Sequence, residues 1–231
     1  MTTKTEVLAW LKDNQDPRGI EHWKKRKADS GGLSSYGIGL TRLRKYAKGL
    51  GRDAKLAKSL WTSKVYEAKV VSLLVDDPKT ITEAQAEKQV EQLQGGFLAH
   101  VFSSCDATLA KAPFAFDLAE KWVKSKDDVR KRCGYGLLYE VSKQKKHFDE
   151  PRFLGHIRAI DKSWKGQSID VLMSMGLALL GMGGRSKKLH AAALKVAKKI
   201  GPVDFDPDGR CDPTDFAARL ASPAITKRLG V

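Results

Sequence analysis

Hydrophobic residues recur every three to four positions along almost the whole chain, and this periodicity constrains the fold more than any other feature. Each patterned stretch has the length of a short helix and is followed within a few residues by a glycine, a proline or a polar turn. Sustained alternation of polar and apolar residues with hairpin-turn chemistry, which strands would require, does not occur in the sequence. The chain is therefore expected to be all-α.

Start and stop signals bound the helices. Thr3 with Glu6 predicts a capping box, and Gly51 and Gly201 follow apolar stripes as helix stops. The predicted helices cover residues 3–13, 17–28, 38–48, 53–62, 64–76, 82–93, 97–110, 114–123, 126–142, 150–160, 167–182 and 187–200.

Helices of similar length in near-regular pairs predict an α-solenoid of stacked antiparallel helical hairpins, as in HEAT and armadillo proteins. A compact irregular helical bundle is the alternative. We expect residues 1–231 to form a single helical-repeat domain, with a less regular C-terminal tail over about 201–231.

The chain is strongly basic, with 42 Lys and Arg against 27 Asp and Glu and a net charge of +15 over 231 residues. Such a charge creates a long-range field that attracts a polyanion, either nucleic acid or an anionic membrane. No apolar run approaches the roughly 20 residues that span a bilayer, and no helix pairs a basic face with a strong inserting face. We therefore expect no membrane partner. Because a helix pattern begins directly at the N-terminus, we expect a cytoplasmic protein.

Basic residues gather in several helical patterns, and a solenoid would collect them on a concave face that fits duplex DNA. A solvated helix face is the alternative for each set taken alone. With no sequence-reading motif, binding should depend on phosphates and shape. The candidate DNA contacts are Arg42, Arg44, Lys45 and Lys48; Arg130, Lys131 and Arg132; and Lys188, Lys195 and Lys199. Further sets are residues 24–27 and Lys143, Lys145 and Lys146.

Three stretches of the chain resemble one family. Residues 36–82, from YGIGLTRLRKYAKGLG onward, are similar to the N-terminal signature of the HEAT-like-repeat DNA alkylation repair proteins, the AlkD-type alkylpurine DNA glycosylases. Residues 112–138 resemble the family's central helices, and residues 187–200 with the following GPVDFD resemble its closing repeat. The resemblance implies a helical solenoid that holds duplex DNA in a basic concavity and excises N3- or N7-alkylated purines.

The resemblance also implies a site made of a Trp, an Asp four residues later, an Arg on a later helix and a second Trp. Arg132 falls where the arginine is expected. Tyr135 and Tyr139 follow at i+3 and i+7, so the three side chains are expected to share a helix face and to present an arginine and aromatic planes to DNA. The alternative is that the tyrosines border the core and that Arg132 is an ion-pair partner.

The rest of the implied site is missing. Residues 94–103 contain neither a tryptophan nor a carboxylate, Leu177 lies near the position of the second tryptophan, and Trp164 comes before that helix. Asp106 is a candidate substitute carboxylate, because it lies about one turn after Phe102. Its alternative is a capping or surface aspartate.

Two further patterns in the sequence resemble a nucleophile–base pair and a metal-binding loop. His100 and Cys105 offer a nucleophile and a base, but residues five apart on a helix are rotated by about 140°, so the pair is not expected to form. Instead Cys105 is expected to be buried on the apolar face of the 97–110 helix, and the cysteines, including Cys133 and Cys211, are expected to be reduced.

The other pattern is the acidic segment 204–215, which matches a calcium loop at Asp204, Asp206, Asp208 and Asp215, whereas its prolines and the absence of a second such loop favour an ordinary turn. No metal or other cofactor is expected.

The sequence thus predicts a monomeric protein that binds duplex or distorted DNA without sequence specificity. An active DNA N-glycosylase with a displaced carboxylate is one alternative. A helical-repeat scaffold that binds an acidic protein is another.

Overall fold

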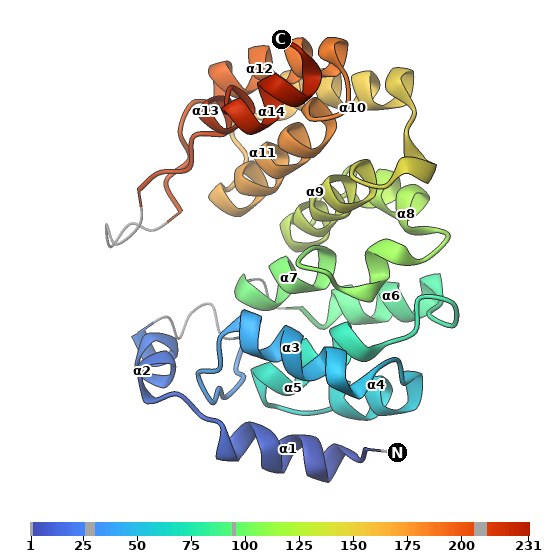
Figure 1. Cartoon of the computed structure of the whole chain (residues 1–231), viewed down its shortest axis with the longest axis vertical. Helices are drawn as coiled ribbons and strands as arrows, with labels where there is room; N and C mark the ends of the chain where they lie inside the picture. Colours follow the sequence, from blue (N-terminus) through green and yellow to red (C-terminus); the bar gives the residue numbers. More distant parts are fainter. Residues whose placement is uncertain (1, 26–30, 94–95, 206–211) are drawn as a thin grey trace. The chain divides into compact units, whose positions relative to one another are not determined.

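The structure is a computed structural model that describes residues 2–25, 31–93, 96–205 and 212–231. These residues form helices joined by short turns, and their only β-type pairings are two isolated bridges, Ser34 with Val65 and Val203 with Thr214 (Figure 1). The prediction of an all-α chain is confirmed. Contacts divide the chain into two compact units, unit 1 over Met1–Ala115 and unit 2 over Phe116–Val231.

Unit 1 is built around one fully enclosed helix. The sequence YEAKVVSLLV has apolar residues on every side, and all but the first and fourth of its residues are buried. Around this helix, α5 (Tyr66–Val75), lie α1 (Lys4–Asp13), α3 (Leu40–Leu50), α4 (Ala54–Trp61) and α7 (Gly96–Ser103). The remaining elements of the unit are α2 (Pro17–Lys25), α6 (Glu83–Glu91) and the short 3₁₀ helix η2 (Thr108–Lys111).

A buried carboxylate fixes the segment before α3. Glu67 is fully buried, and it accepts hydrogen bonds from the Ser35 hydroxyl at 2.6 Å and from the backbone N–H groups of Tyr36 and Ile38 at 3.1 and 3.2 Å. Because a buried charge is tolerated only when it is hydrogen-bonded, these donors explain how an acidic residue can occupy the core helix.

Unit 2 contains the longest helices of the described residues. They are α9 (Asp128–Ser142), α10 (Glu150–Ser163), α11 (Ile169–Gly183) and α12 (Lys187–Ile200), and the shorter α8 (Ala115–Trp122) precedes them. Two short helices, α13 (Phe216–Leu220) and α14 (Pro223–Leu229), follow, and the 3₁₀ helix η3 (Lys145–His147) links α9 to α10.

Alternate helices of unit 2 run in the same direction. Arg132 near the start of α9 contacts Asp170 near the start of α11, and a side-chain atom added at Gly181 near the end of α11 would meet Tyr139 near the end of α9. Helices α10 and α12 are also parallel. At their starts Glu150 accepts a hydrogen bond from Ser186, and near their ends Asp161 pairs with Lys199. Successive helices therefore form antiparallel hairpins that stack in two parallel layers, as HEAT-like repeats do.

The predicted helix over 97–110 is interrupted. It ends at Ser103, and Cys105 and Asp106 adopt left-handed backbone angles, with φ of 59° and 68°, before η2 begins. Non-glycine residues rarely take this conformation, so no local pattern announces the break. The other predicted helices are present in the described residues, with the capping box at Thr3 and left-handed-type stops at Gly51 and Gly201.

The segment expected to be a less regular tail contains α13 and α14. Asp215 accepts a hydrogen bond from the Ala218 N–H and caps α13, and Pro223 opens α14. Among the described residues, no helix has the length and apolarity needed to cross a membrane.

Candidate nucleic-acid interface

The main candidate interface lies where the C-terminal ends of α9 and α11 meet the C-terminal helices. Helices α9 and α11 approach closely because Gly181 has no side chain: a Cβ there would lie 2.3 Å from the Ser142 hydroxyl and 2.9 Å from the Tyr139 ring. Tyr139, whose neighbour Leu138 is buried, is left at the surface with its ring against this seam. The glycine thus sets one wall of a pocket.

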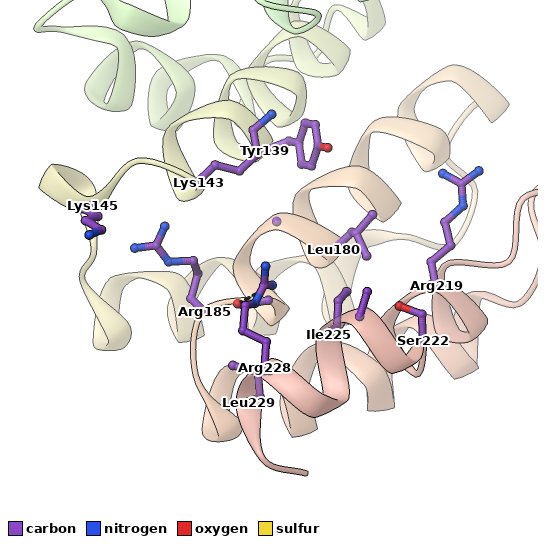
Figure 2. A pocket seen from close by; sticks show the side chains of 13 residues that line it. Tyr139, Lys143, Lys145, Leu180, Arg185, Arg219, Ser222, Ile225, Arg228 and Leu229 are labelled. Atoms are coloured by element: carbon purple, nitrogen blue, oxygen red, sulfur yellow. Dashed lines mark hydrogen bonds between the residues drawn. The ribbon is translucent and has the colours of Figure 1, made fainter.

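The pocket, called here the Tyr139 pocket, has a volume of about 770 Å³ and is lined by α9, α11, α13, α14 and the turns that follow α9 and α11. Figure 2 shows its cationic side chains rising from several elements around the opening. Those cationic residues are Lys143, Lys145, Arg185, Arg219 and Arg228. No carboxylate belongs to the lining that the structure describes, so the pocket is strongly electropositive.

Most of these cations are held by rings and carbonyl groups. Arg185 lies 5.3 Å from the Phe148 ring centre, Arg219 lies 5.8 Å from that of Phe216, and Arg228 donates to the Gly184 carbonyl at 3.1 Å. Cation–π and carbonyl contacts orient a guanidinium without cancelling its charge. These arginines therefore stay available to an external anion.

Lys143 is the exception. Its Nζ lies 4.1 Å from the Tyr139 ring centre, but it also lies 2.7 Å from a Glu140 carboxylate oxygen. Its charge is partly compensated, and we give it a smaller share in anion binding than the arginines.

Arg132 lies in a second, smaller pocket of about 410 Å³ at the opposite ends of α9 and α11. Its Nη1 pairs with Asp170 at 2.7 Å, its side chain is only 12% exposed, and its buried Nε has no hydrogen-bond partner. Lys131 beside it contacts Gln167 at 3.0 Å and Asp128 at 3.5 Å, and Arg130 is half-buried. Arg132 thus has the ion pair that the sequence alternative foresaw, together with one unused donor.

Of the predicted face of Arg132, Tyr135 and Tyr139, the first and last residues line pockets, whereas Tyr135 is buried. Arg132 and Tyr139 line pockets on the same side of α9, two turns apart. Tyr135 is only 4% exposed, and burial raises the pKa of its hydroxyl despite a hydrogen bond with Ser163. Its ring therefore belongs to the core of unit 2, and its contact with DNA stays a prediction.

The basic set of α3 belongs to unit 1. Lys45 and Lys48 are exposed, and Arg42 donates to the backbone carbonyl and side chain of Asn14. Arg44 pairs with Asp106 at 3.2 Å. Next to this pair is a pocket of about 340 Å³ that Lys48, Arg52 and Lys111 also line.

Asp106 therefore lies among cations. Its side chain is 66% exposed, and no aromatic residue belongs to the described lining of its pocket. Its left-handed backbone and its partner Arg44 were not foreseen, because both depend on the break after α7. Its catalytic role stays a prediction.

The exclusion of a His100 and Cys105 pair was wrong. Because the chain leaves the helix after Ser103 and turns through the left-handed Cys105, the Cys105 sulfur comes to 3.1 Å from His100 Nε2. The Ser104 hydroxyl lies 3.3 Å from His100 Nδ1. Cys105 is partly exposed instead of buried, so its expected burial was also wrong.

The lysines of α12 lie in the other layer of unit 2. Lys199 pairs with Asp161 at 2.6 Å and Lys188 lies 3.6 Å from Glu150, both on α10, whereas Lys195 is exposed. These contacts compensate two of the three charges locally.

The acidic segment 204–215 is described only in part. Asp206 and Asp208 lie outside the described residues, Asp204 is exposed, and Asp215 caps α13. Within the described part of the chain, no group of three or more His, Cys, Asp or Glu side chains is arranged to hold a metal. Of the basic stretch at residues 24–27, only Lys24 and Lys25 are described, and both are exposed.

Sequence reasoning missed Arg185, Arg219 and Arg228. Arg185 and Arg219 have no adjacent basic residue, Arg228 follows only Lys227, and the last two arginines lie in the segment expected to be irregular. The Ser-Pro pair at residues 222–223 is a helix-start signal that would have placed Arg228 on the last helix.

A family model for the DNA alkylation repair enzyme matches residues 7–201, which is most of the chain. The chain belongs to the DNA alkylation repair family. The resemblance seen in three separate stretches is thereby confirmed over a continuous range that includes Arg132 and the helices α9, α11 and α12.

The fold of this family member is also that of a solved structure. That structure is described as "a new family of proteins related to the HEAT-like repeat DNA glycosylases with affinity for branched DNA structures"; it superimposes with a TM-score of 0.83 at 18% identity and covers 99% of this chain and 97% of its own. The predicted HEAT-like helical fold is confirmed. No curated protein sequence matches significantly.

Proposed function

We propose that this member of the DNA alkylation repair family binds duplex and branched DNA without sequence specificity, through its phosphates. In unit 2 the Tyr139 pocket would hold one stretch of backbone, and in unit 1 the α3 cations would hold another. The basic concave groove expected from the sequence stays part of this proposal. Support comes from the family membership and from the structural relative, which is described as having affinity for branched DNA.

The single observation that carries the proposal is the lining of the Tyr139 pocket. Its described lining combines five cationic side chains with an aromatic ring and contains no acidic side chain. An acidic protein would also be attracted, but three arginines with oriented guanidinium groups suit bidentate donation to phosphate oxygens. The ring suits an unstacked base or sugar at a branch point.

Sequence-independent binding follows from where the cations are placed. They come from turns and from two helices of five and seven residues, so no long helix offers a row of side chains to a major groove. Contacts from scattered loops position a phosphate backbone and do not read base edges. We further propose that the protein acts as a monomer in the cytoplasm and without a cofactor.

A glycosylase is the second candidate function. The family's excision chemistry needs a carboxylate near the sugar of the alkylated purine, and Asp106 is an exposed carboxylate beside a cationic pocket. If the enzyme is active, N7-methylguanine or N3-methyladenine is released from alkylated DNA, and Asp106→Asn abolishes the release. Absence of release with tight binding would leave the protein a binder only.

The binding proposal is tested by fluorescence anisotropy with a plain duplex and a four-way junction of equal length. Arg185→Glu and Arg228→Glu should each weaken binding by about tenfold, because a phosphate contact becomes a repulsion. Arg158→Glu, an exposed arginine of α10, is the matched control and should change affinity little.

Two further variants separate the sets of cations. Arg132→Ala should weaken junction binding more than duplex binding, because Arg132 lines a pocket at the other end of α9 and lies where the resemblance places the family's arginine. Lys195→Glu tests the α12 set directly. Equal losses for Arg158→Glu and Arg228→Glu would contradict a specific role of the Tyr139 pocket, and preferential binding of acidic proteins over both DNA forms would favour a scaffold.

A further inference from the structure

Unit 1 contains a separate pocket of about 860 Å³ that the DNA-binding proposal does not use. It lies between the C-terminal end of α4, the start of α5 and one face of α6, with Leu33 at its side. Its volume falls within the range of small-molecule sites, which is about 300–1,000 Å³. The pocket is therefore large enough for a ligand of nucleotide size.

Its charge selects an anion. Lys58, Lys64, Lys69 and Lys88 line it, and the described lining includes no aspartate or glutamate. The acidic residues of α6, at positions 83, 87 and 91, are not part of that lining. Lys58, Lys64 and Lys88 are exposed and Lys69 is half-buried. Cationic side chains around one cavity create a local positive potential that favours an anion.

Lys69 is the most enclosed of these cations. Its Nζ lies 4.3 Å from the centre of the Trp61 ring and donates to the Trp61 carbonyl. Burial and, after it, the nearby Lys4 lower the pKa of Lys69, so an arriving phosphate would stabilise the charged form.

The uncharged lining residues of this pocket indicate what the rest of the ligand contains. The Gln89 side chain is buried, with 6% exposure, and its Oε1 has no hydrogen-bond partner. A buried acceptor without a donor is costly and rare, so this oxygen points to a ligand that supplies an N–H group. Leu33, Trp61 and Ala84 add apolar surface beside it, which suits a planar ring.

We propose that this pocket binds a nucleoside phosphate, with the phosphate among the lysines and a base N–H donated to Gln89 Oε1. A nucleoside phosphate could come from two sources, a free nucleotide or the terminal nucleotide of a single strand. The inference does not rest on DNA binding at the Tyr139 pocket, which lies in unit 2.

Isothermal titration calorimetry with the full chain tests the inference. The probes are the four nucleoside monophosphates, the four nucleosides, inorganic phosphate, and an oligonucleotide with a single-stranded end. At least one monophosphate should bind more tightly than its nucleoside and than inorganic phosphate. A terminal strand that binds while no monophosphate does would identify the strand end as the source.

Variants localise the binding. Lys88→Met should weaken it by about tenfold, since one charge-assisted contact is lost. Lys79→Met, an exposed lysine of the preceding turn, is the matched control and should bind like the wild type. Gln89→Leu should fold normally, because it removes an unpaired polar group, and should lower the affinity for the preferred base.

The inference is overturned if no probe saturates at millimolar concentration, if inorganic phosphate binds as tightly as every nucleotide, or if Lys88→Met and Gln89→Leu both bind like the wild type. Binding that is lost in Arg228→Glu but kept in Lys88→Met would assign the nucleotide to the Tyr139 pocket and also overturn it.

Discussion

Single residues in this protein owe their roles to the turns that place them. Cys105 and His100 would point apart on a continuous helix, but the left-handed turn after Ser103 brings sulfur and imidazole to 3.1 Å. Strained non-glycine residues persist only where the surrounding structure holds them, and here η2 and the Arg44 contact to the Cys105 carbonyl do so. The thiol is partly exposed beside a base.

We therefore predict that Cys105 is the more reactive of the two described cysteines. Iodoacetamide should alkylate Cys105 before the buried Cys133, because the imidazole can take the thiol proton as the sulfur attacks. His100→Ala should slow labelling of Cys105 by roughly fivefold or more near neutral pH. Peptide mapping by mass spectrometry measures both sites in one sample. Labelling of Cys105 that is indifferent to His100→Ala would contradict the pairing.

The Glu120 carboxylate gives a prediction about pH. Arg152 donates to it at 2.7 and 2.8 Å and His156 lies 2.8 Å away, and the Arg152 hydrogen bond is the main cause that lowers the pKa of Glu120 from 4.5 to about 2. A depressed carboxyl pKa stabilises the fold above the ordinary value. That contribution is lost as the pH falls from about 4.5 to about 2.

Glu120→Gln should accordingly lower the free energy of unfolding by about 1–2 kcal/mol at pH 7, a figure reduced for partial exposure. The difference from the wild type should shrink below pH 4.5. Urea unfolding at several pH values measures it. Asp117→Asn, whose carboxylate is 81% exposed, is the control and should cost at most about 0.5 kcal/mol. A constant difference at all pH values would refute the assignment.

At the level of helices, glycines decide how closely elements pack. A Cβ at Gly176 of α11 would lie 2.2 Å from the Phe216 ring, which anchors α13 and thereby Arg219 at the Tyr139 pocket. At Gly155 of α10 the same Cβ would meet nothing within 4 Å. Both glycines lie in helices, but only Gly155 has room for a side chain.

Gly176→Ala should therefore destabilise the protein by about 1–3 kcal/mol, although alanine is the better helix former. Gly155→Ala should stabilise it by up to about 1 kcal/mol. Thermal unfolding with a known unfolding enthalpy gives both values. Stabilisation by both substitutions would mean that α13 does not pack on α11 as the structure shows.

The sequence was most informative about elements that carry their own signals. Amphipathic periods and caps located most helices from α1 to α12, because helices such as α3 and α12 bury a stripe that the pattern displays. The break at Cys105 has no such signal, since its cause is tertiary. Helix α13 has only five residues, too few for a period, and depends on Phe216 filling the space over Gly176.

The candidate site was less accessible than the fold. Arg132 could be located by resemblance, but its partner Asp170 is 38 residues away and is joined to it only by the stacking of α9 on α11. Arg185, Arg219 and Arg228 come from three separate segments, and they meet only because residues of α11, α13 and α14 line one pocket. A linear pattern cannot show such a gathering.

For the whole molecule, the net charge of +15 makes binding to any polyanion depend on salt. The affinity for a random duplex should fall steeply between low and physiological ionic strength. Each phosphate neutralised adds about 0.9 to the slope of log affinity against log salt concentration. Arg219→Ala with Arg228→Ala should reduce that slope by about 2, because two phosphate contacts are removed.

Anisotropy titrations at four or more salt concentrations measure the slope, and Arg158→Ala serves as the control with an unchanged slope. A slope near zero for the wild type would mean that charge does not drive the association, whatever the net charge of the chain. An unchanged slope in the double variant would place the phosphates elsewhere on the protein.

The common direction of α9 and α11 has a consequence for how such a protein can grow. Each of these helices ends at the same edge of unit 2, and each is followed there by cationic residues, Lys143 and Lys145 after α9 and Arg185 after α11. Duplicating one hairpin would add another positive turn at the same edge, in register with the last. An added repeat would thus extend the proposed phosphate-binding edge, because the repeated hairpin brings its own cationic turn.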